Sequence, residues 1–64
     1  MALAINIMLV DGEDYSGNPI QTKDVDCLIN NVPIPEHYSY DPTVPNGTIE
    51  AEVQADLTSK GYTW

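Results

Sequence analysis

The sequence contains no phenylalanine and no arginine, and it has a single cysteine and a single histidine among its 64 residues. Without Phe, the large ring that usually anchors a small core is missing. The lone Cys27 has no second cysteine with which to form an intrachain disulfide. A chain of this length buries only roughly 60% of the surface that its unfolded form exposes, which leaves room for one thin core. We therefore predict one small domain over residues 1–64 that gains stability from a partner chain.

Positive charge is also scarce, because Lys23 and Lys60 stand against ten acidic residues and the formal net charge is −8. Proteins that bind nucleic acids neutralise several phosphates with Lys or Arg. Direct nucleic-acid binding is therefore disfavoured, and the same repulsion disfavours binding to an anionic membrane surface. Acidity of this kind either forms a solvated exterior or attracts a basic partner surface.

No hydrophobic run is long enough to span a membrane, since the longest, Leu3 to Val10, is interrupted by Asn6. The N-terminal residues also lack the basic region and the small-residue cleavage site of a secretory signal. We expect the protein to be made in the cytoplasm without a signal peptide, with the virion as a candidate final location.

Patterns that carry catalysis or bind metals are missing as well. Cys27 and His37 lie ten residues apart with a proline pair between them, and nothing places a carboxylate to orient His37 in a nucleophilic pair. The acids that begin at Asp11 do not have the spacing of an EF-hand loop. One Cys and one His do not complete a tetrahedral zinc site. We expect a non-enzymatic protein with no catalytic residues, no metal and no cofactor.

Prolines divide the chain into segments of regular pattern. Leu3 to Val10 alternates as a strand, yet both of its faces are mostly apolar, so it needs cover on both sides or cover from another chain. The segment Asp11 to Pro19 has the composition of an exposed loop. Pro33 to Gly47 holds four prolines, which predicts an extended, polyproline-like stretch on the surface.

The segment Thr22 to Val32 fits two structures. Its apolar residues recur from Val25 at the i, i+3, i+4, i+7 spacing of a helix. Every second residue from Val25 to Ile29 is also apolar, and Asn30-Asn31 suits the positive-φ turn of a hairpin whose return strand lies at a sheet edge. We predict a short helix and retain the hairpin as the alternative.

Residues 48–60 also show two periods at once, because apolar residues recur both at every fourth and at every second position. The intervening Ala, Glu and Gln residues favour a helix, and Gly61 stands where the residue after a helix C-terminus belongs. We therefore predict a helix. The fold class is α+β, a small single domain with an N-terminal β-strand and one or two short helices, and an all-β fold is the alternative.

Every aromatic ring in the sequence carries a polar atom, a type that is enriched where one side is buried and the other is wet. Tyr38-Ser39-Tyr40 resembles the Tyr/Ser mixture of recognition loops. In a surface segment stiffened by prolines, and at the end of the chain, few residues of the domain are available to pack beneath such rings. The predicted partner-binding residues are therefore Tyr38, Tyr40, Tyr62 and Trp64. The alternative is that Tyr38 and Tyr40 fold back over a thin core.

These features favour a structural or interaction protein that completes its burial against other chains, as an oligomer or in a larger assembly. By size and chemistry, the predicted class is a bacteriophage virion subunit, such as a capsid decoration or head–tail accessory protein. The alternative is a soluble inhibitor, a DNA mimic or anti-defence protein, whose acids occupy the nucleic-acid site of a basic host enzyme. That alternative requires the acids around Asp11 to converge with Asp24 and Asp26 on one surface.

Overall fold

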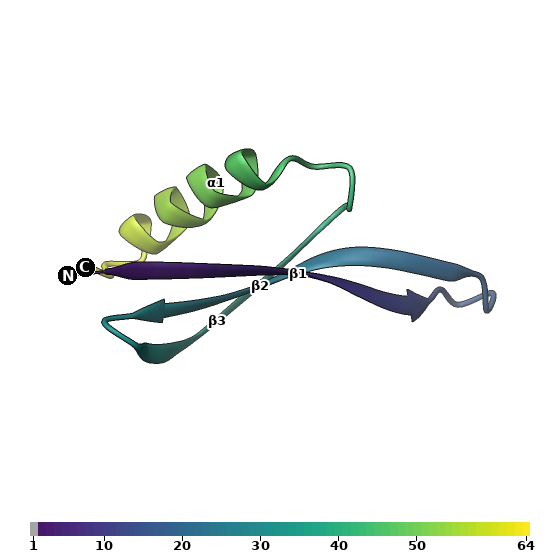
Figure 1. Ribbon diagram of the computed structural model, residues 1–64, viewed down its shortest axis with the longest axis horizontal. Helices are drawn as coiled ribbons and strands as arrows, with labels where there is room; N and C mark the ends of the chain where they lie inside the picture. Colours follow the sequence, from purple (N-terminus) through teal and green to yellow (C-terminus); the bar gives the residue numbers. More distant parts are fainter. Residues whose placement is uncertain (1) are drawn as a thin grey trace.

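The computed structural model describes residues 2–64 as three strands and one helix. The strands β1 (Leu3–Glu13), β2 (Pro19–Ile29) and β3 (Val32–Tyr40) form one antiparallel sheet in the order β1-β2-β3. The helix α1 (Asn46–Ser59) packs on one face of this sheet (Figure 1). The arrangement confirms the predicted small α+β domain.

The first hairpin confirms the predicted N-terminal strand and extends it. Strand pairing continues through Glu13, so the predicted loop from Asp11 to Pro19 is too long. The remaining turn is closed by Asp14, whose Oδ1 accepts the backbone N–H groups of Ser16 and Asn18, each at 2.9 Å. Gly17 has a φ of 79°, a conformation that glycine adopts without steric cost.

The predicted helix from Thr22 to Val32 is wrong. β2 occupies most of this segment, and Asn30 and Asn31 form the turn into β3 with φ values of 52° and 66°. Two positive φ values are what a type I′ hairpin turn requires, and Asn tolerates them better than most residues. As the central strand, β2 satisfies its backbone on both sides and buries Val25 on the helix-facing side.

β3 contains the first part of the proline-rich segment that was predicted to be extended. It is an edge strand, which tolerates the missing N–H groups of Pro33 and Pro35. Its register with β2 also shifts between Asp26 and Leu28. Prolines and an irregular register make this edge a poor template for a further strand.

α1 confirms the helix predicted near the C-terminus, with its first residue at Asn46. It ends in a Schellman motif, in which the N–H of Gly61 donates to the C=O of Thr58 at 3.1 Å and the N–H of Tyr62 donates to the C=O of Leu57 at 3.0 Å. The φ of 92° at Gly61 permits this ending, as the sequence predicted.

The core lies between α1 and the helix-facing side of the sheet. Ile49, Val53 and Leu57 from α1 are fully buried against Val25 and Cys27 of β2. Half-buried apolar side chains surround this cluster, namely Leu3, Ile5, Ile7, Ile34, Tyr38, Tyr40, Val44, Tyr62 and Trp64.

Lys23 fastens the beginning of α1 to the sheet. The helix has no side-chain cap from its N-cap residue Pro45. The Nζ of Lys23 instead donates to the C=O of Val44 and to Oδ1 of Asn46, both at 2.8 Å. The connection between β3 and α1 is therefore fixed from β2.

Replacement of Ile7 by Asp is expected to unfold the chain. Ile7 packs half-buried against the core, and an unpaired carboxylate brought there costs several kcal/mol. That cost is comparable to the total folding stability of about 3–5 kcal/mol that is typical of a domain of this size. Val32→Asp is the matched control, because Val32 is 62% exposed. Circular dichroism should show structure in the control alone, and an unchanged melting curve for Ile7→Asp would contradict the prediction.

The turn at Asn31 offers a second test of the fold. Asn31→Gly removes the residual cost of a positive φ and should raise the free energy of unfolding by a few tenths to about 1 kcal/mol, whereas Asn31→Ala should lower it by about 1 kcal/mol. Asn30 is left unchanged because its Oδ1 accepts the N–H of Ala2 at 2.9 Å. Urea denaturation measures both variants. Equal stability of the two would show that this turn does not depend on positive φ.

Candidate functional site

The four predicted partner-binding residues lie on the helix-facing side of the molecule. Tyr38 and Tyr40 come from β3, whereas Tyr62 and Trp64 follow α1, and all four are half-buried against the core. The expectation that too little of the domain lies beneath these rings is therefore wrong. The two tyrosines of β3 fold over a thin core, as the alternative proposed. Partner binding through the exposed remainder of the four rings stays a prediction.

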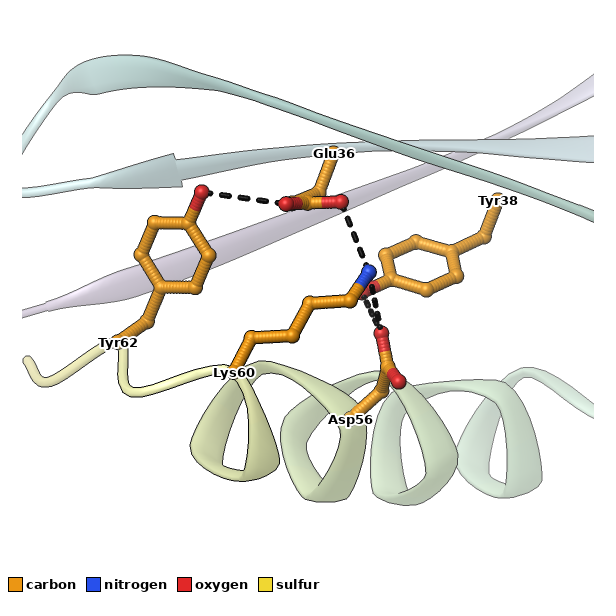
Figure 2. A network of polar contacts seen from close by, with 5 residues as sticks. All are labelled: Glu36, Tyr38, Asp56, Lys60 and Tyr62. Atoms are coloured by element: carbon orange, nitrogen blue, oxygen red, sulfur yellow. Dashed lines mark hydrogen bonds and ion pairs between the residues drawn. The ribbon is translucent and has the colours of Figure 1, made fainter.

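A polar network joins β3 to the C-terminal part of α1 (Figure 2). The Nζ of Lys60 lies 2.9 Å from Oε1 of Glu36 and 3.0 Å from Oδ2 of Asp56. The Tyr38 hydroxyl donates to Oδ2 of Asp56 at 2.5 Å, and the Tyr62 hydroxyl donates to Oε2 of Glu36 at 3.2 Å. The Nζ of Lys60 is also 5.6 Å from the centre of the Tyr38 ring, within cation–π range. These contacts fasten the end of the helix to the edge strand.

The network holds its members in their ordinary charge states. The hydrogen bond from Lys60 lowers the pKa of Glu36, and the hydrogen bonds from Tyr38 and Lys60 lower the pKa of Asp56. Burial, together with the hydrogen bond to Asp56, raises the pKa of Tyr38 to about 12. The two carboxylates raise the pKa of Lys60. No member of the network is thereby poised to exchange a proton near pH 7, as acid–base catalysis requires.

In the part of the chain that the structure describes, no helix lies over the opposite face of the sheet, which we call the open face (Figure 1). Strand alternation directs Met8 of β1 and Asp24 and Asp26 of β2 to this side. Asp26 Oδ1 lies 2.7 Å from Nδ1 of His37 on β3, and both side chains are more than half exposed. Met8, Asp24 and His37 line a shallow groove on this face. The open face thus combines apolar surface with carboxylates.

The β1–β2 hairpin reaches well beyond α1, and this projecting end, residues 9–22, is referred to as the arm (Figure 1). The molecule measures 42 Å along its longest axis and 20 Å along the next. Apolar side chains on the arm and beside it are exposed: Met8 by 59%, Leu9 by 57%, Val10 by 37% and Ile20 by 43%. Sequence reasoning did not assign these residues to a site. The one sequence feature that pointed to them was the apolar character of both faces of the first strand.

Cys27 and the carboxylates form no recognisable reactive centre. Cys27 is buried in the core, and burial raises the pKa of its thiol, so it serves as a small hydrophobic residue. Within residues 2–64, no three His, Cys, Asp or Glu side chains are grouped so that they could hold a metal ion. Over the same residues, no helix is both long and apolar enough to cross a membrane.

Comparison of the chain with known protein families, with curated proteins and with solved structures finds no match.

Lys60→Met should reveal the contribution of the polar network, because it removes the cation and keeps an unbranched apolar stem. The pKa values of Glu36 and Asp56 are lowered in the folded state, so their stabilisation is complete above the ordinary values of 4.5 and 3.8 and is lost as the pH falls through the folded values. The wild type should melt at a higher temperature than Lys60→Met at neutral pH, and this difference should shrink below about pH 4.

Lys23→Met is the matched control for that titration. Lys23 donates to a backbone carbonyl and a neutral amide, so its removal should lower the melting temperature by an amount that does not shrink in the same acid range. A constant difference between the wild type and Lys60→Met from neutral pH to about pH 3 would show that the carboxylates do not contribute.

Proposed function

We propose that this chain is a non-enzymatic subunit of a protein assembly and that it completes its burial against neighbouring chains, copies of itself among them. The observation that carries the proposal is the apolar surface that α1 leaves uncovered, at Met8, Leu9, Val10 and Ile20. Burial of such surface is favourable by roughly 25 cal/mol per Å². Among residues 2–64, only five side chains are fully buried in the core, so contact with neighbours adds substantially to stability.

The distribution of charge supports a protein partner over a nucleic acid or an anionic lipid. The chain has a net charge of −8 and only two lysines. Lys23 is engaged with the beginning of α1, and Lys60 is engaged with Glu36 and Asp56. Neither lysine is therefore free to neutralise phosphates, which is the main source of affinity for nucleic acids.

The specific form that we propose is a bacteriophage virion subunit, such as a capsid decoration or head–tail accessory protein. Its small size, its acidity and the arm support this form, because a projecting hairpin allows a small subunit to reach a neighbour in a shell or a tube. Recruitment into such an assembly would bury the arm and the exposed parts of the aromatic rings.

A soluble inhibitor that mimics DNA is the second candidate, and it needs the acids to share one surface. Asp24 and Asp26 lie on the open face, whereas Glu50 and Glu52 lie on the exposed side of α1. Asp11 is bound to Gln21 on the arm, with Nε2 of Gln21 2.9 Å from Oδ1 of Asp11. This separation of the acids favours the assembly proposal.

Met8→Asp tests the proposed function because Met8 is exposed and lies outside the core. Sedimentation equilibrium should find the wild type heavier than the 7.0 kDa single chain and should find Met8→Asp shifted toward that mass, while circular dichroism shows that Met8→Asp remains folded. Gln54→Glu, which adds the same charge at an exposed position of α1 away from the arm, should assemble as the wild type does.

Salt separates the two candidate functions. Apolar contacts between acidic copies should persist or strengthen as salt screens their repulsion, whereas an inhibitor held by its acids should lose its basic partner. A wild-type chain that sediments at 7.0 kDa at every concentration would contradict the assembly proposal.

A further inference from the structure

The two edges of the sheet differ in how they are protected. β3 carries Pro33, Pro35 and a shift of register, all of which hinder pairing with a further strand. β1 has no proline, no lysine and an unbroken register with β2 from Leu3 to Glu13. A long apolar edge of this kind is a template for another strand.

The hydrogen bonds at both ends of β1 show which backbone groups point outward. The C=O of Ala2 accepts the N–H of Asn30 at 2.8 Å, and the N–H of Asp14 donates to the C=O of Asn18 at 3.0 Å. Even-numbered residues of β1 therefore direct their backbone groups toward β2, because these groups alternate along an antiparallel ladder. The outward groups belong to the odd-numbered residues, which in the uncharged part of the strand are Leu3, Ile5, Ile7 and Leu9. In the described part of the chain, no strand other than β2 pairs with β1.

Charge indicates which strand covers this edge. The net charge is −8, yet the run from Leu3 to Val10 has no ionisable side chain. A second copy can therefore approach along this run without placing like charges opposite each other. On the open face, the carboxylates nearest the axis are those of the two Asp26 residues, which lie opposite Asn6 and would be separated by three strand spacings, about 14 Å, more than the Debye length of about 8 Å.

The register of such a pair follows from the outward groups. Leu3, Ile5, Ile7 and Leu9 are symmetric about Asn6, so a twofold axis at Asn6 places Leu3 opposite Leu9 and Ile5 opposite Ile7. Residues of equal parity then meet, which keeps both helices on one side of the joined sheet. Ile5 and Ile7 are half-buried and Leu9 is 57% exposed in the single chain, so the pairing would cover apolar surface on that side.

We infer that β1 pairs antiparallel with β1 of a second copy, centred on Asn6, and joins the two three-stranded sheets into one. This inference rests on the proposed function and specifies the contact by which the assembly begins. The two Asn6 side chains would meet on the open face as a non-hydrogen-bonded pair, the closest kind of cross-strand pair. Their amides can then donate to and accept from each other.

Asn6→Cys tests this geometry directly. Non-hydrogen-bonded partners have Cα atoms about 4.5 Å apart, within the disulfide range of about 4.4–6.8 Å. Under mild oxidation, Asn6→Cys should form a disulfide-linked dimer, seen as a doubled mass on a non-reducing gel. Ser39→Cys is the matched control, since Ser39 is exposed on β3. The control should cross-link about tenfold more slowly, because its thiols meet only by diffusion. The native Cys27 is buried and stays out of this chemistry.

Hydrogen exchange of the wild type provides a second measurement that needs no substitution. The amides of Ile5, Ile7 and Leu9 should gain protection as the protein concentration rises through the range in which the mass increases, whereas the outward amides of β3 should not. If the wild type assembles but Asn6→Cys cross-links no faster than Ser39→Cys and these amides gain no protection, the β1 pairing is overturned and the proposed function stands. A wild type that stays monomeric overturns both the β1 pairing and the proposed function. If these amides gain protection only when a different protein is added, the partner of β1 is not a second copy.

Discussion

A single helix of fourteen residues has to cover a sheet whose first two strands have eleven residues each. Such a helix is about 21 Å long, whereas a strand of that length reaches about 36 Å. α1 therefore covers one face of the sheet near Val25 and Cys27, and the arm continues past it. The thin core, the open face and the exposed side chains on and beside the arm all follow from this difference in length.

Because apolar burial is limited, polar contacts help to hold α1 in place. Lys23 binds the connection at the beginning of the helix, and Lys60 binds Glu36 and Asp56 near its end. The two lysines are the only basic residues apart from His37. Their use inside the fold leaves an exterior that is almost purely acidic, which restricts contacts with other copies to surfaces without charge. The contacts that hold α1 in place therefore also limit which surfaces can bind another copy.

Local pattern was sufficient for β1 and α1 and insufficient for β2. Residues 48–60 contain strong helix formers and a glycine at the correct end, so propensity decides between their two periods. The segment Thr22 to Val32 also fits two periods. The Asn30-Asn31 turn is a local signal for the hairpin, but the pairing of β2 with strands on both sides, which decides its structure, is non-local. The same limit applies to Tyr38 and Tyr40. Their burial depends on where the helix lies, which no spacing along β3 reveals.

The difference between the two edges connects the sequence pattern to the proposed assembly. From sequence, Leu3 to Val10 needed cover on both sides or from another chain, and in the fold this segment is an edge strand with outward backbone groups. Prolines and an irregular register hinder further pairing at the β3 edge. If the sequence served only to prevent association, prolines or an irregular register would be expected at the β1 edge as well. A regular β1 whose run from Leu3 to Val10 is uncharged, beside a protected β3, limits strand pairing to one edge, and this favours a closed pair of copies over an open chain of them.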